Sequence, residues 1–206
     1  MDERKVIYTV AFGEYELNEP EYDNPDWEFI CFSDRDIESV KWNVVRMSLN
    51  GLNKQKASRL VKIKYDDYLD CDVNIYLDTK FKVKCDLNEF VSENLTTDIA
   101  VMKHNKRDCV YEECKFCKKL GIANSAVLDS QMREYKIEGL PKNFGLYAPG
   151  IMIRRDTQQM RFFMDEWFRE IIKYTARDIP SFSYIVWKNK INISTMPFGK
   201  TYRKFR

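Results

Sequence analysis

The sequence contains a single histidine, His104, and lacks any long apolar run. A closed zinc site with histidine ligands is therefore hard to build, and since a membrane-spanning helix needs about 18 apolar residues, we expect no membrane insertion. The sequence also lacks an excess of charge of one sign, because 34 basic residues stand against 32 acidic ones. A net charge of +2 does not favour nucleic acid as a partner.

The chain length of 206 residues is enough for one sizeable core, so we expect a single domain over residues 1–206. The first residues are charged and lead directly into a strand pattern rather than into the apolar core of a signal peptide. Six cysteines without a secretory signal favour reduced thiols. We therefore expect a cytoplasmic protein, located in the host cytoplasm if it is viral.

Cys114 and Cys117 form a C-x-x-C motif, which has three interpretations. A zinc site would need a second pair of ligands, taken from Cys109 or a distant thiol. A thioredoxin-like pair would open a helix after a strand, whereas this pair lies deep in a helical stretch. Buried structural thiols are the favoured interpretation.

Apolar, β-prone segments alternate with helical patterns in the manner of a nucleotide-binding α/β unit. The expected strands are residues 5–12, 27–32, 42–46, 74–77, 98–104, 150–154 and 191–196. The expected helices are residues 53–65, 85–93, 107–120, 124–138, 157–175 and 180–187. We predict an α/β fold with a mostly parallel central sheet flanked by helices. The basic segment 199–206 is predicted to be a flexible end or a lid over an anionic ligand.

The segment NIYLDTKFKV, residues 74–83, reads as a buried strand that ends at Asp78. An aspartate at this place is either a turn residue or part of a site. Aspartate favours turns, and ligands of open α/β sheets bind at the carboxyl ends of the strands. The position of Asp78 alone favours the turn.

The expected helix 53–65 carries an apolar stripe and a basic surface. The stripe consists of Ala57, Leu60, Val61 and Lys64, and the basic residues are Lys54, Lys56, Arg59 and Lys62. The basic surface is either solvated or faces a phosphate. Lys56 and Arg59 lie three residues apart and so share a face, which makes them the candidates for binding a phosphate.

Two polar motifs combine residue types that core packing would not select. They are the His-x-x-Arg-Asp-x-x-Tyr-x-Glu run from His104 to Glu113 and the Arg-Asp pair at Arg177 and Asp178. With KASRLVKIKYDDYL, NIYLDTKFKVKCDLNEF and GLPKNFGLYAPGIMIRR, they resemble a glycosyltransferase-like family of bacteria and viruses and of plant Golgi proteins linked to pectin and mucilage synthesis. The resemblance covers nearly the whole chain.

The resemblance implies a GT-A-like fold and a hexosyltransferase-like enzyme. Such an enzyme transfers a sugar from a nucleoside-diphosphate donor, by analogy a UDP-sugar, to a glycan or another hydroxyl acceptor. In this fold the central strand ends in an Asp-x-Asp type motif that holds a divalent metal on the donor phosphates.

Asp78 falls on the first acid of that motif, but Lys80 stands at the second. The resemblance implies Mn²⁺ or Mg²⁺ at Asp78, held by one carboxylate together with waters and phosphate oxygens. The alternative is metal-independent transfer, in which Lys80, Arg59 and a neighbouring base stabilise the leaving diphosphate.

The resemblance also indicates residues that contact the donor outside this motif. Thr9 and Phe12 end the first strand, in the segment that surrounds the nucleoside base, and Phe12 and Tyr15 are the candidates to stack on it. The alternative for Phe12 is a place in the core. Arg107, in the first polar motif, is a further donor-binding candidate.

His104 and Asp178 are the catalytic candidates. The alternative for His104 is a structural role. Asp178 would act as the general base on the acceptor hydroxyl in an inverting mechanism, or would orient substrate in a retaining one. An ordinary N-cap for the helix from Pro180 is the alternative for Asp178.

Three departures from the family pattern keep a second function open. They are Lys80, Ile179 in place of a glutamine, and the absence of a histidine that often follows the late strand, here at residues 154–156. They are compatible with a catalytically degenerate protein that binds a sugar nucleotide or a glycan without turnover.

Overall fold

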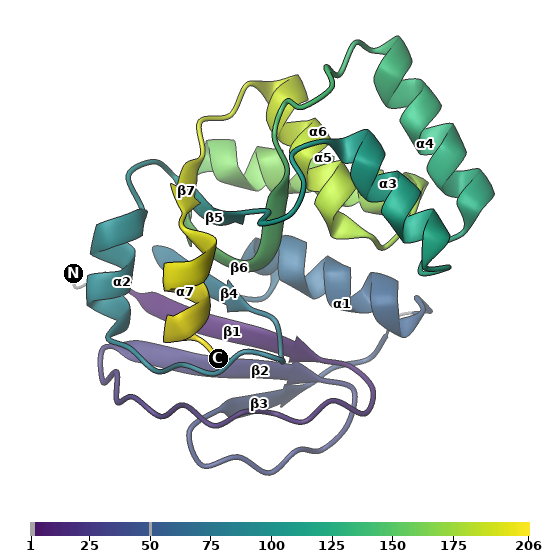
Figure 1. Ribbon diagram of the computed structural model, residues 1–206. Helices are drawn as coiled ribbons and strands as arrows, with labels where there is room; N and C mark the ends of the chain where they lie inside the picture. Colours follow the sequence, from purple (N-terminus) through teal and green to yellow (C-terminus); the bar gives the residue numbers. More distant parts are fainter. Residues whose placement is uncertain (1–2, 50) are drawn as a thin grey trace.

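A central sheet organises the chain, of which the computed structural model describes residues 3–49 and 51–206 (Figure 1). Seven strands of these residues pair in the order β3-β2-β1-β4-β6-β5-β7. They are β1 (Lys5–Ala11), β2 (Trp27–Ser33), β3 (Asn43–Arg46), β4 (Val73–Leu77), β5 (Ile99–Lys103), β6 (Tyr147–Arg155) and β7 (Ser194–Met196). β6 is antiparallel to β4 and β5, whereas the other pairs are parallel. The predicted α/β fold with a mostly parallel sheet is confirmed.

Helices pack on both faces of the sheet (Figure 1). One face carries α1 (Lys54–Ile63), α5 (Gln158–Lys173) and α6 (Asp178–Asn189), with α3 (Val110–Lys119) and α4 (Ser125–Ile137) next to them. The other face carries α2 (Leu87–Asn94) and α7 (Phe198–Lys204), and a short 3₁₀ turn, η1 (Tyr65–Asp67), follows α1. Both faces of β1 and β4 are therefore covered, which explains why their sequences are almost wholly apolar.

The helix starts follow from side chains that cap them. Asp86 accepts a hydrogen bond of 2.9 Å from the backbone N–H of Glu89, so the predicted cap of α2 is confirmed. Asn53 accepts one of 2.9 Å from Lys56 at the start of α1. The predicted helix 180–187 instead begins earlier, at Asp178, with Arg177 as its N-cap. Asp178 therefore lies in the first turn of α6, and the N-cap interpretation is wrong.

The segment 199–206 is neither a flexible end nor a lid, because it forms α7 and docks on the sheet. The side chain of Phe205 is fully buried, and its ring centroid lies 4.9 Å from that of Phe90 in α2. The backbone N–H groups of Lys82 and Lys84 donate to the carbonyls of Phe205 and Lys204, at 2.8 and 3.1 Å. Phe205 thus anchors this basic segment in the core.

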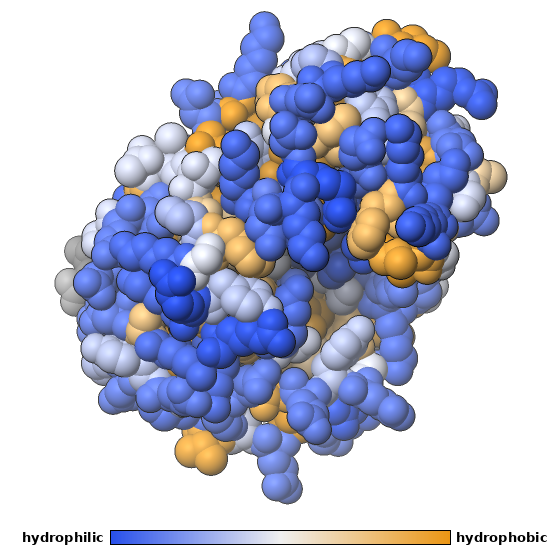
Figure 2. Space-filling model, in the orientation of Figure 1, coloured by the Kyte–Doolittle hydropathy of each residue, from blue (hydrophilic) through white to orange (hydrophobic). Residues whose placement is uncertain are grey.

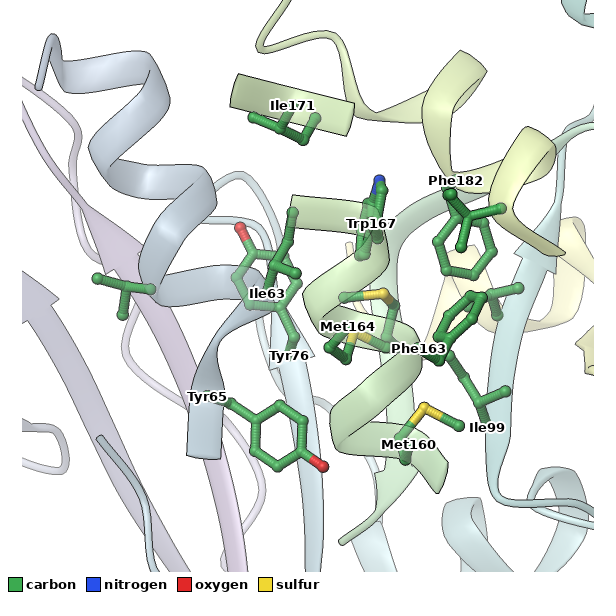
Figure 3. Close-up of a cluster of buried hydrophobic side chains, with 14 of the residues drawn as sticks. Ile63, Tyr65, Tyr76, Ile99, Met160, Phe163, Met164, Trp167, Ile171 and Phe182 are labelled. Carbon is green, nitrogen blue, oxygen red and sulfur yellow. The ribbon is translucent and has the colours of Figure 1, made fainter. Parts of the chain in front are cut away.

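Trp167 of α5 is a fully buried aromatic residue of the core between the sheet and α1, α5 and α6 (Figure 3). Its ring centroid lies 4.8 Å from that of Phe182 in α6, and its indole N–H donates to Ser181 Oγ at 3.0 Å.

The helices formed by the described residues lack the combination of length and apolar character needed to cross a membrane.

Cys114 and Cys117 are buried in α3 against Leu128 of α4. Burial raises the pKa of both thiols, so neither is a reactive thiolate. Their predicted structural role is confirmed.

Candidate functional site

A pocket of about 840 Å³ opens where the parallel strands β1 and β4 end. Figure 2 shows the surface hollowed on this side of the molecule. The pocket wall comes from the segments after β1 and β4, the first part of α1, the turn after α3 and the turn before α6. The lining residues are Val10, Phe12, Glu14, Tyr15, Glu16, Asn18, Lys54, Gln55, Ser58, Arg59, Tyr76, Asp78, Thr79, Lys80, Gly121, Ile122, Ala176 and Arg177. This is the edge at which open α/β sheets bind ligands.

Asp78 is both a turn residue and a member of the pocket wall. Its carbonyl accepts the N–H of Phe81 at 2.9 Å, which closes a turn, and its own N–H donates to Gly150 of β6 at 2.9 Å. Its Oδ1 accepts a hydrogen bond of 2.8 Å from the Tyr76 hydroxyl. A Cβ atom at Gly150 would lie 2.8 Å from Asp78 Oδ2, so glycine leaves room for the carboxylate.

Below the pocket, Asp178 holds two cationic side chains of α1. Lys62 Nζ lies 2.6 Å from Asp178 Oδ2, and Arg59 Nε lies 3.2 Å from the same oxygen. Burial opposes ionisation of Asp178, but the charges of Arg59 and Lys62 outweigh it and hold the pKa of Asp178 well below its usual range. A carboxylate in this state is a weak general base.

The residues around Asp78 do not fit a divalent metal site. Two ammonium groups flank the carboxylate, with Lys62 Nζ 3.8 Å from Oδ1 and Lys80 Nζ 3.6 Å from Oδ2. Within residues 3–49 and 51–206, no three Asp, Glu, His or Cys side chains come together as a metal site would require. Mg²⁺ and Mn²⁺ select oxygen ligands, so a donor set of one carboxylate between two cations disfavours them.

Comparison with known proteins identifies the family of the chain. The model of the TOD1/MUCI70 glycosyltransferase-like domain family matches residues 41–204. The chain belongs to this family. The family match confirms the resemblance predicted from the sequence motifs. No curated protein matches the sequence.

Solved glycosyltransferase structures share the fold of this TOD1/MUCI70 family member. The apo structure of the bifunctional glycosyltransferase WbbM is similar over 96% of the chain, with a TM-score of 0.59 and 12% identity. The chain spans 39% of that protein. Mouse xyloside xylosyltransferase 1, in its apo form, is similar over 96% of this chain and 86% of its own, with a TM-score of 0.52 and 9% identity. At such identities the similarity concerns the GT-A fold.

The residues predicted to surround the base differ in their exposure and in whether they line the pocket. Phe12 lines the pocket while its side chain remains buried, and Tyr15 lines it with 57% of its surface exposed. Thr9 is buried and is not among the described residues of the pocket wall. Of the two aromatic residues only Tyr15 has exposed surface for stacking, because Phe12 packs in the core. Contacts of Phe12 and Thr9 with the base stay predictions.

Lys56 and Arg59 do not act as one pair, although both lie on α1. Arg59 lines the pocket, and its Nε also donates to the carbonyl of Ala176 at 3.2 Å. Lys56 Nζ instead donates to the carbonyl of Ile172 at the end of α5, at 3.1 Å. The geometry supports Arg59 as the donor-binding candidate of the two.

The first polar motif forms a separate cluster around Glu113, a buried residue of α3. Arg107 Nε donates to the Glu113 carboxylate at 2.7 Å, and His104 Nε2 lies 3.9 Å from the same oxygen. His104 Nδ1 accepts the backbone N–H of Arg107 at 3.1 Å, and burial lowers the pKa of this imidazole. Neither His104 nor Arg107 belongs to the described pocket wall, so their roles in catalysis and donor binding stay predictions.

Sequence reasoning missed two residues of the site. Lys62 was expected on the basic surface of α1, but its side chain is fully buried because α1 lies between β1 and α5. Arg177 lines the pocket, and within the described part of the chain its buried Nε has no hydrogen-bond partner. The Arg-Asp motif was the signal for Arg177, whereas Lys62 looks like any exposed lysine of a basic helix.

Proposed function

We propose that this protein transfers a sugar from a nucleoside-diphosphate donor, a UDP-sugar, to a hydroxyl group of a glycan acceptor. The observation that carries the proposal is the pocket at the ends of β1 and β4, where aromatic and cationic side chains line one cavity. Its volume of about 840 Å³ is in the range of ligand sites, roughly 300–1,000 Å³.

The two ends of a nucleoside diphosphate match different parts of the pocket wall. Tyr15, which is 57% exposed, offers aromatic surface to the base, which suits stacking. Arg59, Lys80 and Arg177 line the same cavity, and their positive charges suit the diphosphate.

Transfer breaks the bond between the sugar C1 and the diphosphate oxygen, which leaves with the electron pair. An acceptor oxygen bonds to C1, and its proton passes to the departing diphosphate. The negative charge that develops on the diphosphate needs a cationic partner. We propose that Arg59, Lys80 and Arg177 supply it. Asp178, held ionised between Arg59 and Lys62, is better suited to orient these groups than to accept the acceptor's proton.

Donor binding is expected to be independent of divalent metal, because Lys62 and Lys80 flank Asp78 at the end of β4. UDP at about 100 times its Kd should stabilise the protein by ~2.7 kcal/mol and raise the Tm by about 5–10 °C for a domain of this size. Differential scanning fluorimetry should give the same shift with EDTA and with Mn²⁺. A shift seen only with Mn²⁺ would support the metal alternative, and none with any nucleoside diphosphate would count against the proposed function.

Replacing Arg59 by methionine is expected to weaken UDP binding by about 10–100-fold, because a hydrogen bond to a charged group contributes roughly 1.5–3 kcal/mol. Isothermal titration calorimetry at a temperature where the variant is folded measures the change. Arg169→Met on α5 is the matched control, since the Arg169 side chain is 73% exposed and pairs with Glu166 on the surface. Equal affinities of the two variants would remove Arg59 from the donor site.

A binder without turnover is the second candidate, and the weak basicity of Asp178 is the observation that favours it. Incubating UDP-sugars with a panel of glycan acceptors separates the two functions. Transfer or hydrolysis of a donor excludes a pure binder, whereas UDP binding without consumption of any donor supports it.

A further inference from the structure

Lys62 is a charged residue enclosed in the protein core directly beneath the pocket. Its side chain has no exposed surface, and its ammonium lies between two carboxylates, at 2.6 Å from Asp178 and 3.8 Å from Asp78. The ammonium also lies 4.6 Å from the ring centroid of Tyr76, the residue whose hydroxyl binds Asp78. Because Asp178 belongs to α6 and Asp78 follows β4, Lys62 joins segments that are distant in the sequence.

The backbone of Lys62 is fixed as firmly as its side chain. Its carbonyl, in the last turn of α1, accepts the Tyr8 hydroxyl at 2.6 Å and Arg154 Nη1 at 3.2 Å. Arg154 is itself fully buried and donates to Asn74 Oδ1 at 2.9 Å and to the Tyr8 hydroxyl. Residues of β1, β4 and β6 thus hold the end of α1 in register with the sheet, so the position of the Lys62 ammonium is set by the core.

We infer that Lys62 is a positioning residue of the donor site, which supplies part of the counter-charge of Asp78 and Asp178 and so weakens their hold on Arg59 and Lys80, the cations needed for the diphosphate. The inference rests on the proposed function and assigns a role to a residue that does not itself line the pocket. Lys62 acts on the two carboxylates directly. Through them it affects the positions of Arg59 and Lys80.

The reason is the balance of charge around the two acids. Arg59 and Lys80 each already lie within 4 Å of one of them, Arg59 at 3.2 Å from Asp178 and Lys80 at 3.6 Å from Asp78. Without the Lys62 ammonium, both carboxylates lose a partner in a site of low polarity and pair more closely with these two cations. The cations then become less available to a diphosphate, and the positive charge beneath the pocket falls by one.

Lys62→Met tests the role, because methionine keeps much of the length of the side chain and removes its charge. UDP affinity is measured by isothermal titration calorimetry at a temperature at which circular dichroism shows the variant to be folded. We expect the Kd to rise at least tenfold. A purely structural role would lower the Tm and leave the Kd of the folded variant within twofold of wild type, which would overturn the inference.

A second comparison applies if Lys62→Met does not fold. The double variant Lys62→Met/Asp178→Asn removes both charges of the buried pair, and Asp178→Asn is its reference. We expect at least fivefold weaker UDP binding in the double variant, because Asp78 has then lost Lys62, whereas equal affinities overturn the inference. Absence of UDP binding by the wild-type protein is a different result, which overturns the proposed function and with it this role of Lys62.

Discussion

Replacing Asp178 by asparagine is expected to lower the free energy of unfolding by about 3–5 kcal/mol, the usual effect of removing one partner from a buried ion pair. The substitution leaves Lys62 with no exposed surface and without the carboxylate 2.6 Å away. The remaining acid, Asp78, is 3.8 Å from the ammonium and is shared with Lys80. Burial already lowers the pKa of Lys62, and losing Asp178 removes the charge that most opposes this effect.

Urea unfolding at pH 7 measures the change, with Asp70→Ala as the control. Asp70 also forms an ion pair, with Arg4, but its side chain is 97% exposed, so its loss should change stability by less than about 1 kcal/mol. The pKa of Asp178 is lowered on folding, so its contribution to stability is complete above its unfolded value of about 3.9 and declines as the pH falls below it. The difference between wild type and variant should therefore shrink in acid. Equal stability at pH 7 would mean that the pair contributes nothing.

Trp167→Ala is expected to destabilise the protein by about 3–5 kcal/mol, the range for removing a large buried aromatic side chain. Trp167 of α5 is fully buried against α6, and its ring centroid lies 4.8 Å from that of Phe182 (Figure 3). The substitution also leaves Ser181 Oγ without the indole N–H that it accepts. Both effects act against the packing of α6, whose first residue is Asp178.

Phe162→Ala is the matched control on the same helix, because Phe162 is 57% exposed and its removal leaves no cavity. We expect the control to change the free energy of unfolding by less than about 0.5 kcal/mol, as is usual for surface substitutions. Chemical denaturation of both variants gives the comparison. Similar losses in the two would show that the core around Trp167 does not depend on this side chain.

Much of the fold could be predicted because its signals are local. The buried strands around Tyr8 and Tyr76 are almost wholly apolar, and the spacing of Asp86 and Glu89 predicts the capped start of α2. The antiparallel direction of β6 had no such signal, since it depends on the path of the chain through residues 104–146. The docking of α7 was missed for a similar reason, because its basic residues suggested solvent whereas the buried Phe205 decides its place.

The candidate site was predictable where the chain reaches it at the end of a strand. Asp78, Lys80 and Phe12 follow β4 and β1, and the sheet brings them together with Arg59. The buried partner of Asp178 was not predictable in this way. Lys62 and Asp178 are 116 residues apart, and their contact depends on the packing of α1 against α5 and α6.

The backbone hydrogen bonds that residues 204 and 205 accept from the segment after β4 also determine when this segment can complete its structure during synthesis. Residues 82 and 84 bind the carbonyls of residues 205 and 204, so a ribosome must add some 120 further residues before these bonds can form. Until then, the segment just after Asp78 lacks two of its backbone partners. The segment that continues from the turn carrying Lys80 therefore gains its full set of backbone hydrogen bonds only after residues 204 and 205 have emerged.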